Sequence, residues 1–212
     1  MIFGKRNTEL PDAASAMPGR ESRQHAVGDR HLVLGNPIET DPPEGMEAVV
    51  VGLGCFCGEE KTYWEVPGVW STSVGYAGGI SPNPTYEEVC TGRTGHAEVV
   101  RVIFDPAEVS FQQLLQVFWE NHDPTQGMRQ GNDRGSQYRS IIFTTTPAQQ
   151  KEAEESREHY QKQMTAAGYG QITTAIEPLD EYYYAEDYHQ QYLVKNPFGY
   201  CPLHATGVTY DG

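Results

Sequence analysis

The chain has 212 residues, enough for one ordinary domain with an appendage and a real hydrophobic core. Its 29 acidic side chains outnumber its 15 basic ones, and the net charge of −14 argues against nucleic acid or an anionic membrane surface as a partner. It contains no apolar run of about 18 residues and lacks the residue pattern of a secretory signal, so we expect a cytoplasmic protein.

The first predicted elements are an arm, a strand and a helix. Residues 1–45 are rich in proline, glycine and charge, and we expect an extended arm there, although a disordered tail has the same composition. Residues 47–53 form a nearly unbroken apolar run, which predicts a strand covered on both faces. Residues 58–66 follow as a helix that ends before Pro67 and Gly68.

Cys55 lies where this strand turns into the helix. Free backbone N–H groups at a helix N-terminus favour a thiolate, so we expect a lowered pKa and a nucleophilic Cys55. Its glycine neighbours, Gly52, Gly54 and Gly58, allow another molecule to approach closely. The alternative is a buried and inert thiol, the usual state of a single cysteine.

The chain has four cysteines, Cys55, Cys57, Cys90 and Cys201. Four are too few for a disulfide-stapled secreted scaffold of this length, and no Cys-x-x-Cys motif occurs. We therefore expect free thiols, some of them redox-active.

The remaining segments alternate between strands and helices. Glu98 is unexpected in the apolar strand 97–104, and Ser110 with Gln113 makes a capping box for a helix over 111–122. Residues 123–137 form a polar loop long enough to be a candidate site-forming segment. The other predicted elements are strands over 69–76, 138–144 and 172–177, and helices over 85–90, 146–167 and 185–195.

These interleaved elements predict an α/β (α+β) fold, a two-layer sandwich of a mixed sheet with packed helices. We expect an irregular arm over 1–45 and one catalytic domain over 46–195. A mobile tail over 196–212, with two prolines and three glycines, would carry Cys201.

Ordered blocks of sequence from about residue 46 to 201 carry a family resemblance. The blocks are Gly-Cys-Phe-x-Gly at 54–58, Gly-Tyr-Ala-Gly-Gly at 75–79, Asn-Pro-Thr-Tyr at 83–86, Gly-Arg-Thr-Gly-His-Ala-Glu at 92–98, and the blocks at 118–124, 131–140, 184–192 and 196–201. With them the chain resembles the peptide methionine sulfoxide reductases of the A type.

The resemblance implies repair of oxidised proteins by reduction of methionine S-sulfoxide. Cys55 would attack the sulfoxide sulfur and become a sulfenic acid. Cys201 would then close a disulfide with Cys55, to be reduced directly by thioredoxin or a similar dithiol. Neither a prosthetic cofactor nor a metal is implied. Cys90 matches a structural thiol.

The resemblance also assigns the residues around the reacting atoms. Glu98 would donate the proton to the sulfoxide oxygen, because a carboxyl desolvated in an apolar strand has a raised pKa. The alternative is that Glu98 lies on a solvent-exposed face of the strand. Tyr86 and Tyr138 would hydrogen-bond the oxygen. The substrate would be bound by Phe56, Cys57, Asp133 and Tyr192.

Cys57 departs from the family pattern, which has tryptophan at this position. The change removes most of an aromatic surface from the clasp for the substrate methyl group, so we expect weaker substrate binding. Cys57 is a natural variation, an engineered substitution or a third redox thiol. If residues 55–57 are helical, neighbours two apart point to opposite sides, and a direct Cys55–Cys57 disulfide would be strained.

Two other functions remain open from the residues alone. A cysteine hydrolase would need His96, His122 or His189 as a base beside Cys55. A non-enzymatic metal-binding module would use Cys55 and Cys57 with histidines, although Cys-x-Cys is not a usual zinc spacing.

Overall fold

The structure is a computed structural model and describes residues 8–199, 201 and 203–212. Strands and helices alternate through most of the chain. In order they are β1 (Glu47–Gly52), α1 (Phe56–Trp64), β2 (Val69–Ala77), α2 (Tyr86–Cys90), β3 (Ala97–Phe104), α3 (Phe111–Glu120), β4 (Arg129–Gln130), β5 (Asp133–Arg134), a 3-10 helix (Ser136–Tyr138), β6 (Ile141–Thr144), α4 (Pro147–Ala166), β7 (Ala175–Pro178), β8 (Tyr182–Tyr184) and α5 (Tyr192–Lys195).

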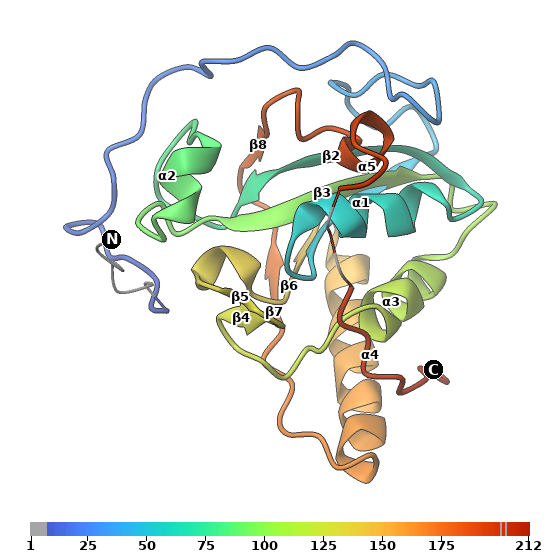
Figure 1. The fold of residues 1–212 in the computed structure, drawn as a ribbon. Coiled ribbons are helices and arrows are strands. Elements are labelled where there is room, and N and C mark those ends of the chain that lie inside the picture. Colours follow the sequence, from blue (N-terminus) through green and yellow to red (C-terminus); the bar gives the residue numbers. More distant parts are fainter. Residues whose placement is uncertain (1–7, 200, 202) are drawn as a thin grey trace.

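The main sheet of the described residues has the strand order β7-β6-β1-β3-β2-β8. Its pairs are antiparallel except β6 with β7, which are parallel. In Figure 1, α1 lies across β2 and β3, while α3 and α4 pack together beside β6 and β7. The predicted α/β class with a mixed sheet and packed helices is confirmed.

The sheet is covered on both faces. Val49 and Val51 of β1 belong to the large core, which also holds Trp119 of α3. Val50, between them, points to a smaller cluster with Val99 and other apolar side chains of the opposite face. This alternation confirms that β1 is buried on both sides, as its unbroken apolar run predicted.

Several predicted element boundaries are confirmed, and local side-chain chemistry explains why. The Ser110 hydroxyl accepts from the backbone N–H of Gln113, and the Gln113 side chain accepts from the backbone N–H of Ser110, which completes the capping box. Thr146 caps α4 in front of Pro147.

The helix predicted over 185–195 is wrong. The structure has β8 just before this segment, turns through most of it, and only the short α5 at its end. The side-chain amide of Gln190 bonds both backbone groups of Val74 at 2.9 Å. Gln191 has a left-handed backbone (φ 47°), and its N–H donates to Glu60. Bonds to distant residues thus replace the helical bonds here.

The N-terminal arm follows the outside of the domain. Arg20 forms an ion pair with Glu88 of α2, and His25 bonds the carbonyl of Tyr184 in β8 at 2.9 Å. Farther along, the buried His31 ring lies 2.8 Å from the Thr72 hydroxyl of β2. In Figure 1 the blue arm arches over α2 and β8 before it enters β1.

The C-terminal segment runs from the start of α1 to α3 and α4 (Figure 1). The Tyr160 hydroxyl of α4 donates to the carbonyl of Val208 at 2.9 Å, and Tyr210 is buried. Mobility of residues 196–212 stays a prediction. Among the described residues, no helix has the length and apolar character needed to cross a membrane.

Candidate active site

Cys55 occupies the N-cap position of α1, directly after the connection from β1. Its backbone is extended (φ −86°, ψ 117°), and α1 begins at Phe56. Gly54 before it has φ +132°, and a β-carbon there would lie 2.7 Å from the Gln130 side chain. The predicted strand-to-helix position of Cys55 is therefore confirmed, two residues nearer the helix than the sequence suggested.

Three cysteine sulfurs gather at this helix start. The sulfurs of Cys55 and Cys201 are 3.5 Å apart, and with Cys57 all three lie within 4.8 Å of one another. A β-carbon on Gly58 would lie 3.0 Å from the Cys201 sulfur, so this glycine lets the C-terminal segment cross α1. We call Cys55, Cys57 and Cys201 the sulfur cluster. Cys90 ends α2 and is exposed.

The opposite-side geometry expected for helical residues 55–57 does not apply, because Cys55 has the extended backbone of an N-cap. Its sulfur therefore lies on the same side as the Cys57 sulfur.

The lowered pKa predicted for Cys55 is also wrong in this arrangement. A hydrogen bond shared with Cys201 raises the pKa of Cys55 to about 12. The same bond lowers the pKa of Cys201 to about 5. A second negative charge beside the first is strongly opposed, so the pair carries at most one thiolate near neutral pH. The neighbouring sulfur outweighs the helix N-terminus here.

The Glu98 carboxyl lies beside the start of α1. Its side chain is only 1% exposed, and its oxygen accepts the backbone N–H of Phe56 at 3.3 Å. Burial, and then the nearby Cys55 sulfur, raises the pKa of Glu98 well above its usual range. Burial therefore favours the protonated carboxyl, and the alternative of a glutamate on a solvent-exposed strand face is wrong.

A second buried carboxyl, Glu59, was missed from the sequence. It is 1% exposed, and neither carboxylate oxygen has a hydrogen-bond partner among the described residues. Burial is the main cause that raises the pKa of Glu59, to which the nearby Cys55 and Glu98 add. A glutamate in the first turn of a helix usually faces water, so only the packing of α1 against the sheet reveals this one.

Two tyrosines lie near Glu98. Burial is the main cause that raises the pKa of both Tyr86 and Tyr138, so each phenol keeps its proton and can donate a hydrogen bond. Tyr86 begins α2, where its backbone N–H donates to Glu186 at 2.8 Å. Tyr138 ends the 3-10 helix that precedes β6.

Aromatic rings surround Phe56 on the buried side of the cluster. The Phe56 ring centroid lies 5.0 Å from that of His189 and 6.0 Å from that of Tyr76. His189 in turn lies 4.5 Å from the Tyr86 ring. The structure therefore links two predicted site residues, Phe56 and Tyr86, through a histidine and forms an apolar wall beside Cys55.

Three predicted residues remain: Cys57, Asp133 and Tyr192. Cys57 is 7% exposed within the large core. Asp133 lies in β5, close enough to add to the raised pKa of Glu98 and Tyr138. Tyr192 begins α5, and Gly199 packs against its ring. Asp133 therefore lies near Glu98 and Tyr138, whereas Tyr192 contacts the C-terminal segment.

The three histidines considered as a base for Cys55 have other partners. His96 bonds the Ser81 carbonyl at 2.7 Å, and His122 bonds the Ser140 hydroxyl at 2.7 Å. Burial lowers the pKa of His189 to about 4, and its ring lies among aromatic rings with the Glu186 carboxylate 4.0 Å away. These partners argue against the cysteine hydrolase.

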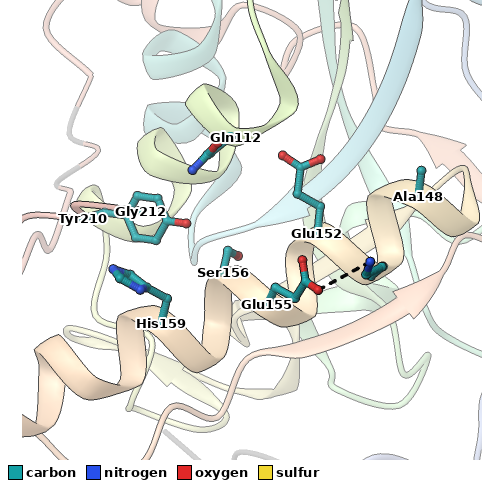
Figure 2. Close-up of a pocket in the computed structure, with 9 residues that line it drawn as sticks. Gln112, Ala148, Glu152, Glu155, Ser156, His159, Tyr210 and Gly212 are labelled. Carbon is teal, nitrogen blue, oxygen red and sulfur yellow. Dashed lines mark ion pairs between the residues drawn. The ribbon is translucent and has the colours of Figure 1, made fainter.

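A separate pocket lies between α3, α4 and the C-terminus. Figure 2 shows that His159 and Tyr210 face it. Lys151, which also lines the pocket, forms an ion pair of 3.7 Å with Glu155. None of its lining residues belongs to the predicted site. The pocket is therefore distinct from the sulfur cluster.

Residues 47–210 match the family model of peptide methionine sulfoxide reductases. The chain belongs to this family. A methionine sulfoxide reductase of Rhodospirillum centenum is 59% identical over 208 residues, which cover 98% of this chain and 94% of that protein. The chain is thus an oxidoreductase of the A type that acts on methionine sulfoxide.

Solved structures of other reductases have the same fold. Methionine sulfoxide reductase A of Corynebacterium diphtheriae is 51% identical, covers 95% of this chain and 97% of its own, and has a TM-score of 0.86. Mxr1 of Saccharomyces cerevisiae in complex with Trx2 is 25% identical, covers 79% of this chain and 93% of its own, and has a TM-score of 0.52.

Proposed function

We propose that this reductase works by attack of the Cys55 sulfur on the sulfoxide sulfur of methionine. The attack gives methionine and a sulfenic acid on Cys55, while the sulfoxide oxygen takes up a proton. One observation carries the proposal: Cys55 lies at the N-terminus of α1 with the buried Glu98 carboxyl and the Cys201 sulfur as its neighbours.

Glu98 is the proposed proton donor. Its raised pKa keeps the carboxyl protonated at neutral pH, which suits a group that must protonate a poor leaving oxygen. Tyr86 and Tyr138 donate hydrogen bonds to the same oxygen, since their phenols stay protonated. Substrate entry separates Cys201 from Cys55, which removes the bond that raises the pKa of Cys55 and lets the thiolate form.

The substrate methyl group packs on Phe56 and its aromatic neighbours, with Cys57 at the edge of this wall. Asp133 and Tyr192 hold the rest of the substrate, free methionine sulfoxide or an oxidised protein. We infer a preference for the S epimer at sulfur, as in the A-type family that the chain resembles.

Cys201 then condenses with the sulfenic acid, releasing water and forming the Cys55–Cys201 disulfide. The 3.5 Å between the two sulfurs supports this pairing. A thioredoxin reduces the disulfide, without a prosthetic cofactor; the yeast Mxr1 complex with Trx2 supports this partner. A cytoplasmic location stays a prediction from the sequence.

Single-turnover chemistry tests the proposal. One equivalent of a methionine sulfoxide peptide added to the reduced protein should consume two thiols and yield one methionine per chain. Cys55→Ser should yield none, while Cys90→Ser, an exposed control thiol, should behave as the native chain. Thiol loss that persists in Cys55→Ser would refute the nucleophile.

A further inference from the structure

The Cys57 sulfur lies close to two other sulfurs, a position that a residue serving only as apolar pocket wall would not require. The side chain of Cys57 is 7% exposed, and its sulfur lies within 4.8 Å of the sulfurs of both Cys55 and Cys201. A tryptophan at this position would supply apolar surface only. A thiol at this distance is in reach of any disulfide that forms between its two neighbours.

The local backbone keeps the three sulfurs together. Cys55 is held as the N-cap, Cys57 is fixed two residues later in α1, and Cys201 crosses the helix over Gly58. A disulfide bond is about 2 Å long, so side-chain rotation with a small shift of the C-terminal segment brings Cys201 to either partner. A Cys55–Cys57 bond would have to close between residues only two apart in the chain, whereas Cys201 reaches both from a separate segment, so Cys201 is the shared partner.

We propose that Cys57 takes the disulfide over from Cys55. The Cys57 thiolate attacks the Cys201 sulfur of the Cys55–Cys201 disulfide. A Cys57–Cys201 bond forms, the Cys55–Cys201 bond breaks, and Cys55 leaves as a thiolate. No net oxidation occurs, and the proton lost by the Cys57 thiol ends on Cys55 or in solvent. The step rests on the proposed function, which supplies the first disulfide.

The exchange has a preferred direction. Cys57 is 7% exposed within the large core, and this burial, which persists when Cys55 and Cys201 are joined, disfavours a thiolate at its position. Cys55 at the helix N-terminus is the better leaving group once Cys201 is bound elsewhere. The disulfide therefore comes to rest on Cys57 and Cys201, and the nucleophile is released before any reductant arrives.

This relay predicts a second turnover without reductant. After the exchange, Cys55 reduces a second sulfoxide and stays as a sulfenic acid, because Cys201 is already in a disulfide. The native chain should then form two methionines, whereas a chain without the relay stops at one.

The experiment measures methionine formed per chain with excess methionine sulfoxide peptide and no reductant, followed by peptide mapping with dimedone as the sulfenic acid trap. We expect two methionines, a Cys57–Cys201 disulfide and dimedone on Cys55. Cys57→Ser and Cys57→Trp should each give one methionine and a Cys55–Cys201 disulfide. Cys90→Ser should still give two, which excludes Cys90 as the third thiol.

Each outcome has a distinct meaning. One methionine from the native chain, with the disulfide on Cys55 and Cys201 only, would overturn the relay while leaving the proposed function intact. Two methionines from Cys57→Ser would also overturn it. No methionine from any chain would refute the proposed function itself. Serine is nearly isosteric with cysteine, so Cys57→Ser should keep the fold. Its circular dichroism spectrum, compared with that of the native chain, distinguishes loss of the relay from misfolding.

Discussion

Replacing Glu98 with glutamine removes the proton donor from the site and nearly preserves the side-chain shape. The glutamine carbonyl still accepts the Phe56 N–H, which now lies 3.3 Å from the carboxyl oxygen. What is lost is the proton that burial keeps on this carboxyl. General acids contribute about 10²–10⁴-fold to a rate, so we expect kcat to fall by that factor, or by about 3–5 kcal/mol of barrier.

The assay is single-turnover formation of methionine over a range of pH. In the native enzyme the rate should fall as pH rises through the raised pKa of Glu98, because the acid loses its proton there. The Glu98→Gln variant should lack this alkaline limb. Glu59→Gln is the matched control, since it removes an equally buried carboxyl without a bond to Phe56. A Glu98→Gln rate within about threefold of native would refute the assignment.

Three other predictions concern stability and substrate binding. Glu59 and Glu98 are buried carboxyls with a raised folded pKa, so each should make the free energy of unfolding fall with pH above the unfolded value of 4.5, by up to about 1.4 kcal/mol per pH unit. The buried Glu60, whose pKa is raised to about 7, adds to this fall. Urea unfolding of Glu59→Gln should show a shallower fall, and an unchanged slope would contradict this. Trp119→Phe removes the 3.0 Å bond to Ser156 in the core and should cost about 1–3 kcal/mol in the same assay, with the exposed Val33→Ala near zero. Cys57→Trp should lower KM for a methionine sulfoxide peptide by enlarging the apolar wall, and an unchanged KM would count against that role.

Much of the fold follows from local patterns. The apolar runs of β1 and β3 and the capping box at Ser110 involve neighbours in sequence, and all were predicted. The missed turn around Gln190 depends on Val74, which is 116 residues away, and Gln191 depends on Glu60 in the same manner. A helical pattern of polar residues contains no sign of such partners.

The positions of Cys55 and Glu98 in the fold were predictable, and the electrostatics around them less so. Family resemblance supplied Cys201 as the partner of Cys55, since a separation of 146 residues carries no local signal. The raised pKa of Glu98 followed from its apolar strand. The raised pKa of Cys55 did not, because it comes from a sulfur that the fold brings to the helix start. The burial of Glu59 likewise depends on packing.

The most direct test of the central claim uses a chain in which only the nucleophile of the sulfur cluster remains. One equivalent of a methionine sulfoxide peptide is added to the reduced double variant Cys57→Ser, Cys201→Ser, and the protein is analysed by mass spectrometry after dimedone treatment. We predict one methionine and one dimedone adduct per chain, on Cys55. An adduct on Cys90, or methionine formed without any adduct, would contradict attack by Cys55.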